Sequence, residues 1–171
     1  MTLIPRRLFR HRPNGQALPE FALILPVFML IFMGILQFGF LLSGQVGLIN
    51  SVREAARYGS TAPTTTGGPA GNINAYLTGT VLPRNVAGYS AAQLVSSSAG
   101  YCRYQDPSGK WAVRLTVQVT YGHPLFIPLV GDIVDGIDGT DDGNFTLGAS
   151  ESMRVENPPL SSAPGALSAC T

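Results

Sequence analysis

The chain has 171 residues, of which 45% are hydrophobic and only 12% are charged, and its formal net charge is +1 at pH 7. A chain of this length allows one modest domain and leaves no room for a large enzyme core. Four of the 11 basic residues lie within residues 1–15, so the remainder carries seven basic against 10 acidic residues, a net of −3. Nucleic-acid-binding proteins usually show a clustered basic face, and this distribution argues against that class.

An apolar stretch at residues 21–42 has Gln37 as its one strongly polar member. Because a helix needs roughly 20 such residues to cross the hydrocarbon core of a bilayer, the stretch predicts a transmembrane helix. Arg6, Arg7, Arg10 and Arg12 precede it without any acid. This basic excess predicts a cytoplasmic N-terminus and an exported remainder. Residues 43–46 match a signal-peptide cleavage site poorly, so we expect the helix to be retained.

Residues 15–59 carry a run of recognisable features. Gly15 is followed five positions later by Glu20 and then by Phe21, within the string GQALPEFALILPVF. The string continues through Gly34 and QFG to residues 50–59, NSVREAARYG. Together these residues resemble the TadE-like pseudopilins of tight-adherence (Flp) pilus systems, and Gly15 with Glu20 resembles the processing site of type IV pilin-like proteins.

The resemblance implies that residues 1–15 are a leader, which a prepilin peptidase removes after Gly15. Gln16 would then carry the new amino group, and Glu20 of a neighbouring subunit could pair with it to set the register of assembly. Without the resemblance, Glu20 could simply lie in the headgroup layer, because the helix dipole favours an acid near a helix N-terminus. Pro19 replaces the apolar residue usual in the family, and proline is tolerated in the first turn of a helix.

The family likeness also implies a location and partners. The expected location is the bacterial inner (cytoplasmic) membrane, crossed once, with the C-terminal domain outside the cytoplasm. The expected partners are the membrane, other pilin-like subunits, the pilus assembly platform and the prepilin peptidase.

Small residues recur at steps of four along the predicted helix and form what we call the small-residue ladder: Gly39, Ser43, Gly47, Ser51, Ala55 and Gly59. In membranes this spacing lets helix backbones approach, so the ladder predicts a packing surface for partner helices. Chance in a glycine-rich chain is the alternative, and the ladder turns around the helix, so it cannot all serve one neighbour. We expect the helix at residues 16–59 to end at Gly59, and a helix of that length requires lateral neighbours or a covering domain.

The exported part is predicted to be a small α+β domain of the pilin-like kind at residues 72–156, after a linker at residues 60–71. Residues 111–121 alternate apolar and polar side chains and predict a half-buried strand. The turn sequence Asp-Pro-Ser-Gly at residues 106–109 predicts a hairpin with residues 98–104. Residues 145–155 supply a third strand, interrupted by Glu151, which gives a three-stranded antiparallel sheet. Residues 72–99 are ambiguous, because Gly79, Pro83 and Gly88 should keep any helical piece short. Residues 157–171 are expected to form a flexible tail.

The sequence shows no catalytic constellation. His11 and His123 do not form a pair, and no nucleophile has a base within a motif, so we expect no enzyme, cofactor, metal or small-molecule substrate. Five acids between residues 132 and 142 could bind calcium, but their spacing misses the EF-hand pattern and favours a solvated loop: Asp132, Asp135, Asp138, Asp141 and Asp142. Cys102 and Cys170 both lie in the exported part, where a disulfide can persist, and whether they pair is open.

Two functions of different classes therefore remain. The first is a minor pseudopilin that is processed after Gly15 and assembled into a pilus, or its assembly complex, through the N-terminal helix. The second is a permanently anchored extracytoplasmic binding module or adhesin that never polymerises. A permanent anchor needs neither Gly15 nor Glu20 in this arrangement, so these two residues favour the first function.

Overall fold

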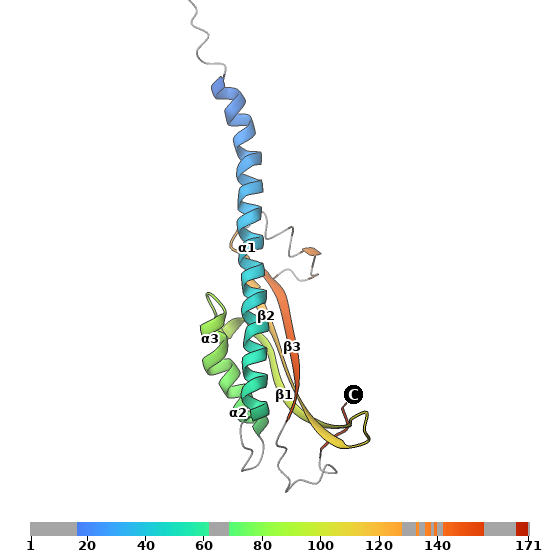
Figure 1. Ribbon diagram of the computed structural model, residues 1–171. Helices are drawn as coiled ribbons and strands as arrows, with labels where there is room; N and C mark the ends of the chain where they lie inside the picture. The colour runs from blue at the N-terminus through green and yellow to red at the C-terminus, as the bar shows by residue number, and fades with distance from the viewer. Residues whose placement is uncertain are drawn as a thin grey trace, which may run out of the picture.

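The computed structural model describes residues 17–61, 69–127, 142–155 and 167–170, together with residues 133, 136, 137 and 139. A long helix, α1 (Ala17–Thr61), precedes a short helical segment and three strands. Figure 1 shows that the C-terminal half of α1 lies along the sheet, whereas its N-terminal half projects beyond the rest of the molecule. The predicted α+β fold is confirmed.

Helix α1 has 45 residues and runs through Pro26 without interruption. It ends two residues after Gly59, the C-terminus that the sequence predicts. Side chains satisfy two carbonyl groups near this end, because the Tyr101 hydroxyl donates to the Gly59 carbonyl at 2.8 Å and the Thr61 hydroxyl donates to the Arg57 carbonyl at 2.9 Å. The segment expected to be a linker at residues 60–71 is therefore helical at both ends, and residues 62–68 lie outside the described residues.

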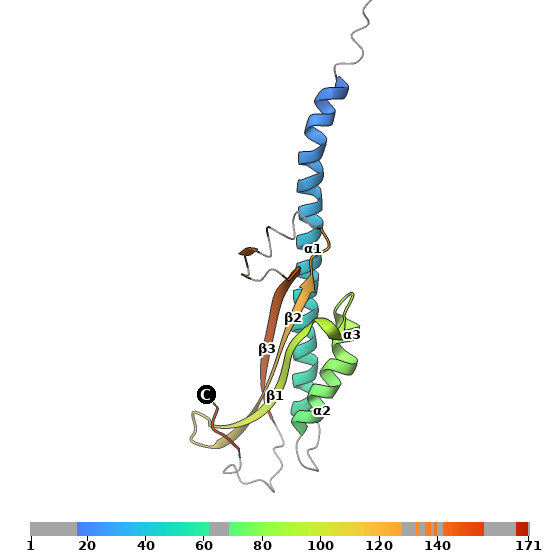
Figure 2. The ribbon, with the colours of Figure 1, turned by 180° about the vertical axis from the view of Figure 1, so that it is seen from behind.

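The ambiguous region contains one nearly continuous helical segment. It consists of α2 (Pro69–Tyr76), the π-helical turn η1 (Leu77–Val81) and α3 (Leu82–Asn85). The expectation that Gly79 and Pro83 separate short pieces is wrong, because the Leu82 N–H reaches the carbonyl of Leu77, five residues back. Pro83 falls in the first turn of α3, where a missing donor is tolerated. Figures 1 and 2 show this segment beside the C-terminal half of α1.

The sheet has the order β1-β2-β3, with antiparallel neighbours. Its strands are β1 (Leu94–Gln105), β2 (Trp111–Pro124) and β3 (Asn144–Arg154). The predicted hairpin is confirmed, although β1 begins at Leu94, directly after the 3₁₀ turn η2 (Ala91–Gln93). In the turn, the Gly109 N–H donates to the Asp106 carbonyl at 2.9 Å, and Gly109 has a φ of +78° that favours glycine. Hydrogen bonds from Ser108 and Lys110 hold the pKa of Asp106 below its ordinary value.

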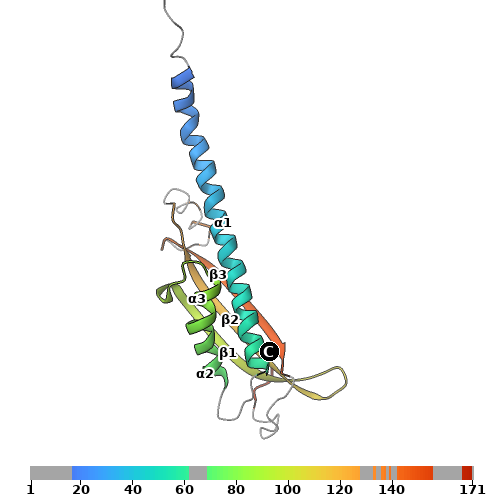
Figure 3. The same ribbon diagram turned by 60° about the vertical axis from the view of Figure 1, so that its left-hand side comes forward.

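The core lies between the sheet and the helices. The alternation along β2 places one face of the strand inward, and these residues are buried: Val113, Leu115, Val117, Val119 and Tyr121. They pack against apolar residues of α1 and of the helical segment, namely Leu48, Val52, Ala55, Ala56, Ile73, Leu77 and Leu82. Figure 3 shows α1 crossing the sheet along its length. The sheet is thus covered by helices on one face, so its other face keeps polar side chains.

The C-terminal residues 167–170 lie against the outer edge of β1. Cys102 and Cys170 form a disulfide across 68 positions of the sequence. An isolated parallel bridge joins Arg103 to Ala169: the Arg103 N–H donates to the Ser168 carbonyl at 2.9 Å, and the Cys170 N–H donates to the Arg103 carbonyl at 3.0 Å. The tail expected at residues 157–171 is thus tied to β1 at residues 167–170, and residues 157–166 and 171 lie outside the described residues. On a chain-entropy model, closing such a loop contributes roughly 4 kcal/mol.

Candidate assembly helix

Residues 17–36 of α1 form a bare half, in which the side chains are exposed or partly exposed. Glu20 is the one charged residue among them, and it is exposed in the first turn, with Phe21 beside it. The most apolar window of α1 has a mean hydropathy of 2.5 and is only 6% buried. By length and composition, α1 can span a membrane. Gly15 and Gln16, the predicted processing site, lie outside the described residues.

Gln37 begins the covered half of α1, residues 37–61. Its side chain is 0% exposed, and its Oε1 accepts a hydrogen bond from the Phe126 N–H at 3.1 Å. One turn later Leu41 packs against Leu125 and Ile127, from the segment that follows β2. The predicted crossing at residues 21–42 therefore overlaps the folded domain. The bare residues 17–36 measure about 30 Å at about 1.5 Å per residue, which matches the thickness of a hydrocarbon core.

All six residues of the small-residue ladder lie in the covered half of α1, but the domain covers only four of them. Gly47, Ser51, Ala55 and Gly59 are buried within this chain. A Cβ on Gly47 would overlap the backbone carbonyl of Asn85, and one on Gly59 would overlap the side chain of Ile73. The prediction that the ladder serves partner helices is wrong for these four residues, because the chain's own domain occupies that face. Gly39 faces open space and Ser43 is exposed.

Gly44, which lies outside the ladder, makes a close contact with His123 that the sequence did not indicate. A Cβ at this position would come within 2.5 Å of His123 Cδ2. His123 is 4% exposed, and its Nδ1 lies 3.1 Å from the Pro124 carbonyl oxygen. The ring thus fills the space that the glycine leaves. A shallow apolar hollow of about 300 Å³ adjoins this contact and is lined by Phe40, Ser43, Gly44, Ala87, Gly88, His123 and Phe126.

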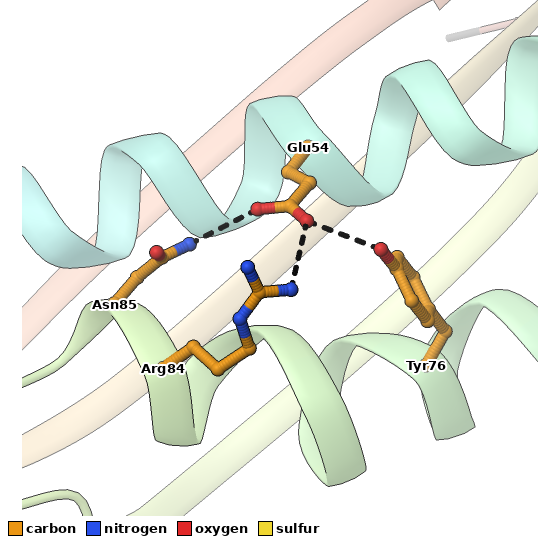
Figure 4. A network of polar contacts seen from close by, with 4 residues as sticks. All are labelled: Glu54, Tyr76, Arg84 and Asn85. Carbon is orange, nitrogen blue, oxygen red and sulfur yellow. Dashed lines mark hydrogen bonds and ion pairs between the residues drawn. The ribbon is translucent and has the colours of Figure 1, made fainter.

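Glu54 fastens the helical segment to α1, as Figure 4 shows. One of its carboxylate oxygens accepts a hydrogen bond from the Tyr76 hydroxyl at 3.1 Å, and the other accepts one from the Asn85 amide at 3.3 Å. Arg84 lies 3.9 Å from the same carboxylate. The hydrogen bond to Glu54 is the main cause that raises the pKa of Tyr76. Tyr76 also stacks on Tyr58, with ring centroids 4.3 Å apart.

A second set of polar contacts joins α1 to β3. Arg53 Nε lies 3.3 Å from Glu151 Oε2, and the Gln45 amide donates to the Gly148 carbonyl at 3.0 Å. Glu151 interrupts the apolar period of the third strand, and this ion pair explains why an acid stands there. Sequence reasoning missed the roles of Arg53 and Glu54, although both lie inside the family-like string.

The described residues contain no group of three or more His, Cys, Asp or Glu that could hold a metal ion. Of the acidic run, Asp142 is described, and its Oδ1 accepts a hydrogen bond from the Asn144 N–H at 2.9 Å. The other four acids of that run fall outside the described residues. The described residues of this region therefore offer packing surfaces, hydrogen bonds and ion pairs.

The fold and this helix define a class: a small α+β domain carried on one long apolar N-terminal helix that can anchor it in a membrane. A comparison with protein families makes the assignment more specific, because the family model described as TadE-like protein matches residues 15–57. The resemblance stated from the sequence is confirmed for these residues. The family is a structural one associated with Tad pili. No curated protein and no solved structure gave a match.

Proposed function

We propose that this chain is a minor pseudopilin of a tight-adherence (Flp) pilus system, trimmed after Gly15 and assembled through the bare half of α1. The observation that carries the proposal is the division of one helix into a covered half and a bare half. A contiguous apolar surface of this size is not left in water by a folded protein, so lipid or other helices must cover residues 17–36.

Assembly from the bilayer exchanges lipid for neighbouring helices. This exchange offers little hydrophobic gain, because lipid tails are as apolar as Leu, so close packing and polar pairing decide the association. Gly39 and Ser43 remain available for close packing, since the domain does not cover them. Glu20 is the one charge in the bare half, and we propose that it pairs with the amino group of Gln16 in a neighbouring subunit. Buried pairing of this kind would fix register, because an unpaired acid in hydrocarbon costs several kcal/mol.

The proposal includes a location and partners. The chain is inserted in the bacterial cytoplasmic membrane with its N-terminus inside and its domain outside, where Cys102 and Cys170 can remain oxidised. Its partners are other pilin-like subunits, the assembly platform and the prepilin peptidase. A permanently anchored binding module would share the fold and the location, but it would keep residues 1–15.

N-terminal sequencing of the mature protein tests the processing step. In cells that contain the peptidase we expect the mature chain to begin at Gln16, and in cells that lack it the chain should keep its leader. Gly15→Val is the matched variant, since a branched side chain at the cut should block processing without changing the helix. A mature chain that keeps Arg6 to Arg12 in peptidase-competent cells would contradict the proposal and favour the anchored module.

Glu20→Gln tests the assembly step. Glutamine keeps the size of the side chain but removes its charge, so we expect unchanged membrane insertion and reduced co-purification with pilus components. Glu20→Asp is the control, because it keeps the charge and should retain part of the association. Equal co-purification of the wild type and Glu20→Gln would show that Glu20 does not set register.

A further inference from the structure

Phe40 of α1 and Phe126 of the segment after β2 form an exposed aromatic pair at the start of the covered half. Their rings lie edge to face, with centroids 6.0 Å apart. Phe40 is 53% exposed and Phe126 is 63% exposed, so neither ring is used to fill the core. Burying apolar surface away from water is favourable by about 25 cal/mol per Å². Two adjacent exposed aromatic rings therefore suggest that something outside this chain covers them.

The position of the pair along α1 supplies the reason. If residues 17–36 fill the hydrocarbon core, Phe40 lies only about 6 Å beyond it along the helix, which is inside the headgroup layer. Gln37 fixes the height of Phe126 at this level, because its Oε1 accepts the Phe126 N–H at 3.1 Å. Both rings thus adjoin the surface from which the bare half emerges.

The chain around the pair is also suited to a lipid surface. Residues 37–52 and residues 124–127 contain no Lys, Arg, Asp or Glu. Residues 16–171 carry seven basic against 10 acidic residues. Anionic headgroups would repel this net negative charge, so a zwitterionic surface is the better partner.

We propose that the aromatic pair docks the domain on the outer surface of the bilayer, with Phe126 seated among zwitterionic headgroups. The occupant of this surface is lipid, because the pair is continuous with the exposed apolar face of the membrane-spanning half. The docking holds the domain close to the membrane before any assembly step, and it does not depend on pilus formation.

The single tryptophan makes the proposal testable. Trp111 stands at the other end of β2 from Pro124 and is 54% exposed. A strand of this length separates the two ends by about 40 Å, so a lipid-borne quencher that reaches Phe126 cannot reach Trp111. The experiment uses the full chain in phosphatidylcholine vesicles that contain phosphatidylcholine brominated near the top of its acyl chains. The three chains compared are the wild type, Trp111→Phe with Phe126→Trp, and Trp111→Phe with Phe28→Trp.

We expect bromolipid to quench the tryptophan at position 126 and the one at position 28, and to leave the wild-type emission unchanged. Quenching at position 28 without quenching at position 126 would overturn the proposal. Emission at position 126 that ignores bromolipid but changes with the protein-to-lipid ratio would assign the surface to a second copy and would also overturn it. Absence of quenching at position 28 would overturn the membrane placement on which the docking depends. None of these results bears on cleavage after Gly15, which is tested separately.

Discussion

The two halves of α1 belong to one continuous helix, but they differ in composition and in surroundings. Residues 37–61 lie on the domain, where Leu48, Val52 and Ala55 are 0% exposed. Residues 17–36 contact no other element of the described chain closely enough to bury an apolar side chain. In the covered half, the small side chains and glycines are determined by close packing, because a larger residue would collide with the neighbouring elements of the domain. The bare half is specified by length and polarity alone, which is what a lipid bilayer requires.

The largest expected contrast between the halves comes from truncating a leucine in each. Leu48→Ala should lower the free energy of unfolding of the domain by about 2–5 kcal/mol, because it leaves a cavity at a fully buried site. Leu23→Ala, at a position that is 77% exposed, should leave that free energy unchanged. Denaturant titration in detergent, followed by the near-ultraviolet signal, measures both variants. Equal losses would show that the bare half also packs on the domain.

Two glycines of the covered half, one packed against the domain and one facing open space, give the next contrast. Gly47→Ala should destabilise the domain by about 1–3 kcal/mol, because the new methyl group meets the backbone of Asn85, which cannot yield as a side chain can. Gly39→Ala meets nothing within 4 Å and should stabilise the helix by up to about 1 kcal/mol. Thermal melting of the two variants in the same detergent checks the difference. A loss of stability in Gly39→Ala would show that another group packs closely against Gly39.

Glu54→Gln tests the polar contacts of the covered half through the titration of Tyr76. Removing the carboxylate should return the pKa of Tyr76 towards its ordinary value, because the hydrogen bond to Glu54 and the charge of Glu54 both raise it. The sign follows from linkage: a raised tyrosine pKa adds stability below the ordinary value near 10.0, and this is lost as pH rises through the raised value. Ultraviolet detection of tyrosinate follows the change, with Tyr76→Phe identifying the signal. An unchanged titration would show that Glu54 does not raise the pKa of Tyr76.

The smallest expected effect is that of Arg53 and Glu151. Their side chains are 62% and 29% exposed, so solvent screens the pair, and a double-mutant cycle with alanine should give a coupling of about 0–1 kcal/mol. The coupling should decrease further in high salt. A coupling well above this range would mean that the pair fixes α1 on β3 more strongly than its exposure indicates.

The elements with strong periodicity could be predicted from the sequence, and the contacts between them could not. The strict alternation in residues 111–121 predicts β2, and the turn chemistry of Asp106 and Gly109 predicts its hairpin. The step of four in the small-residue ladder predicts close packing, but a single helix pattern cannot say whether the neighbour is another subunit or the chain's own domain. Only the position of Asn85 beside Gly47 decides this, and that contact joins distant parts of the sequence.

Other features could not be predicted for the same reason, because they depend on contacts between distant parts of the sequence. Gln37 is one polar residue in an apolar run, and nothing in its local sequence shows that the Phe126 N–H occupies its carbonyl oxygen. Cys170 lies in a stretch rich in small residues that reads as a tail, and its pairing with Cys102 follows from the bridge to β1. The π-helical turn at η1 depends on tertiary packing, since it brings Leu77 and Val81 into the core in spite of Gly79.

The unbroken passage of α1 from the bare half into the covered half has a mechanical consequence. A pull along the helix axis is carried directly into the contact with the sheet, without a hinge at Gln37 to absorb it. The force then acts in shear over the whole length of that contact, so many side chains bear it together. A subunit drawn from the membrane by its helix would therefore bring its domain along intact.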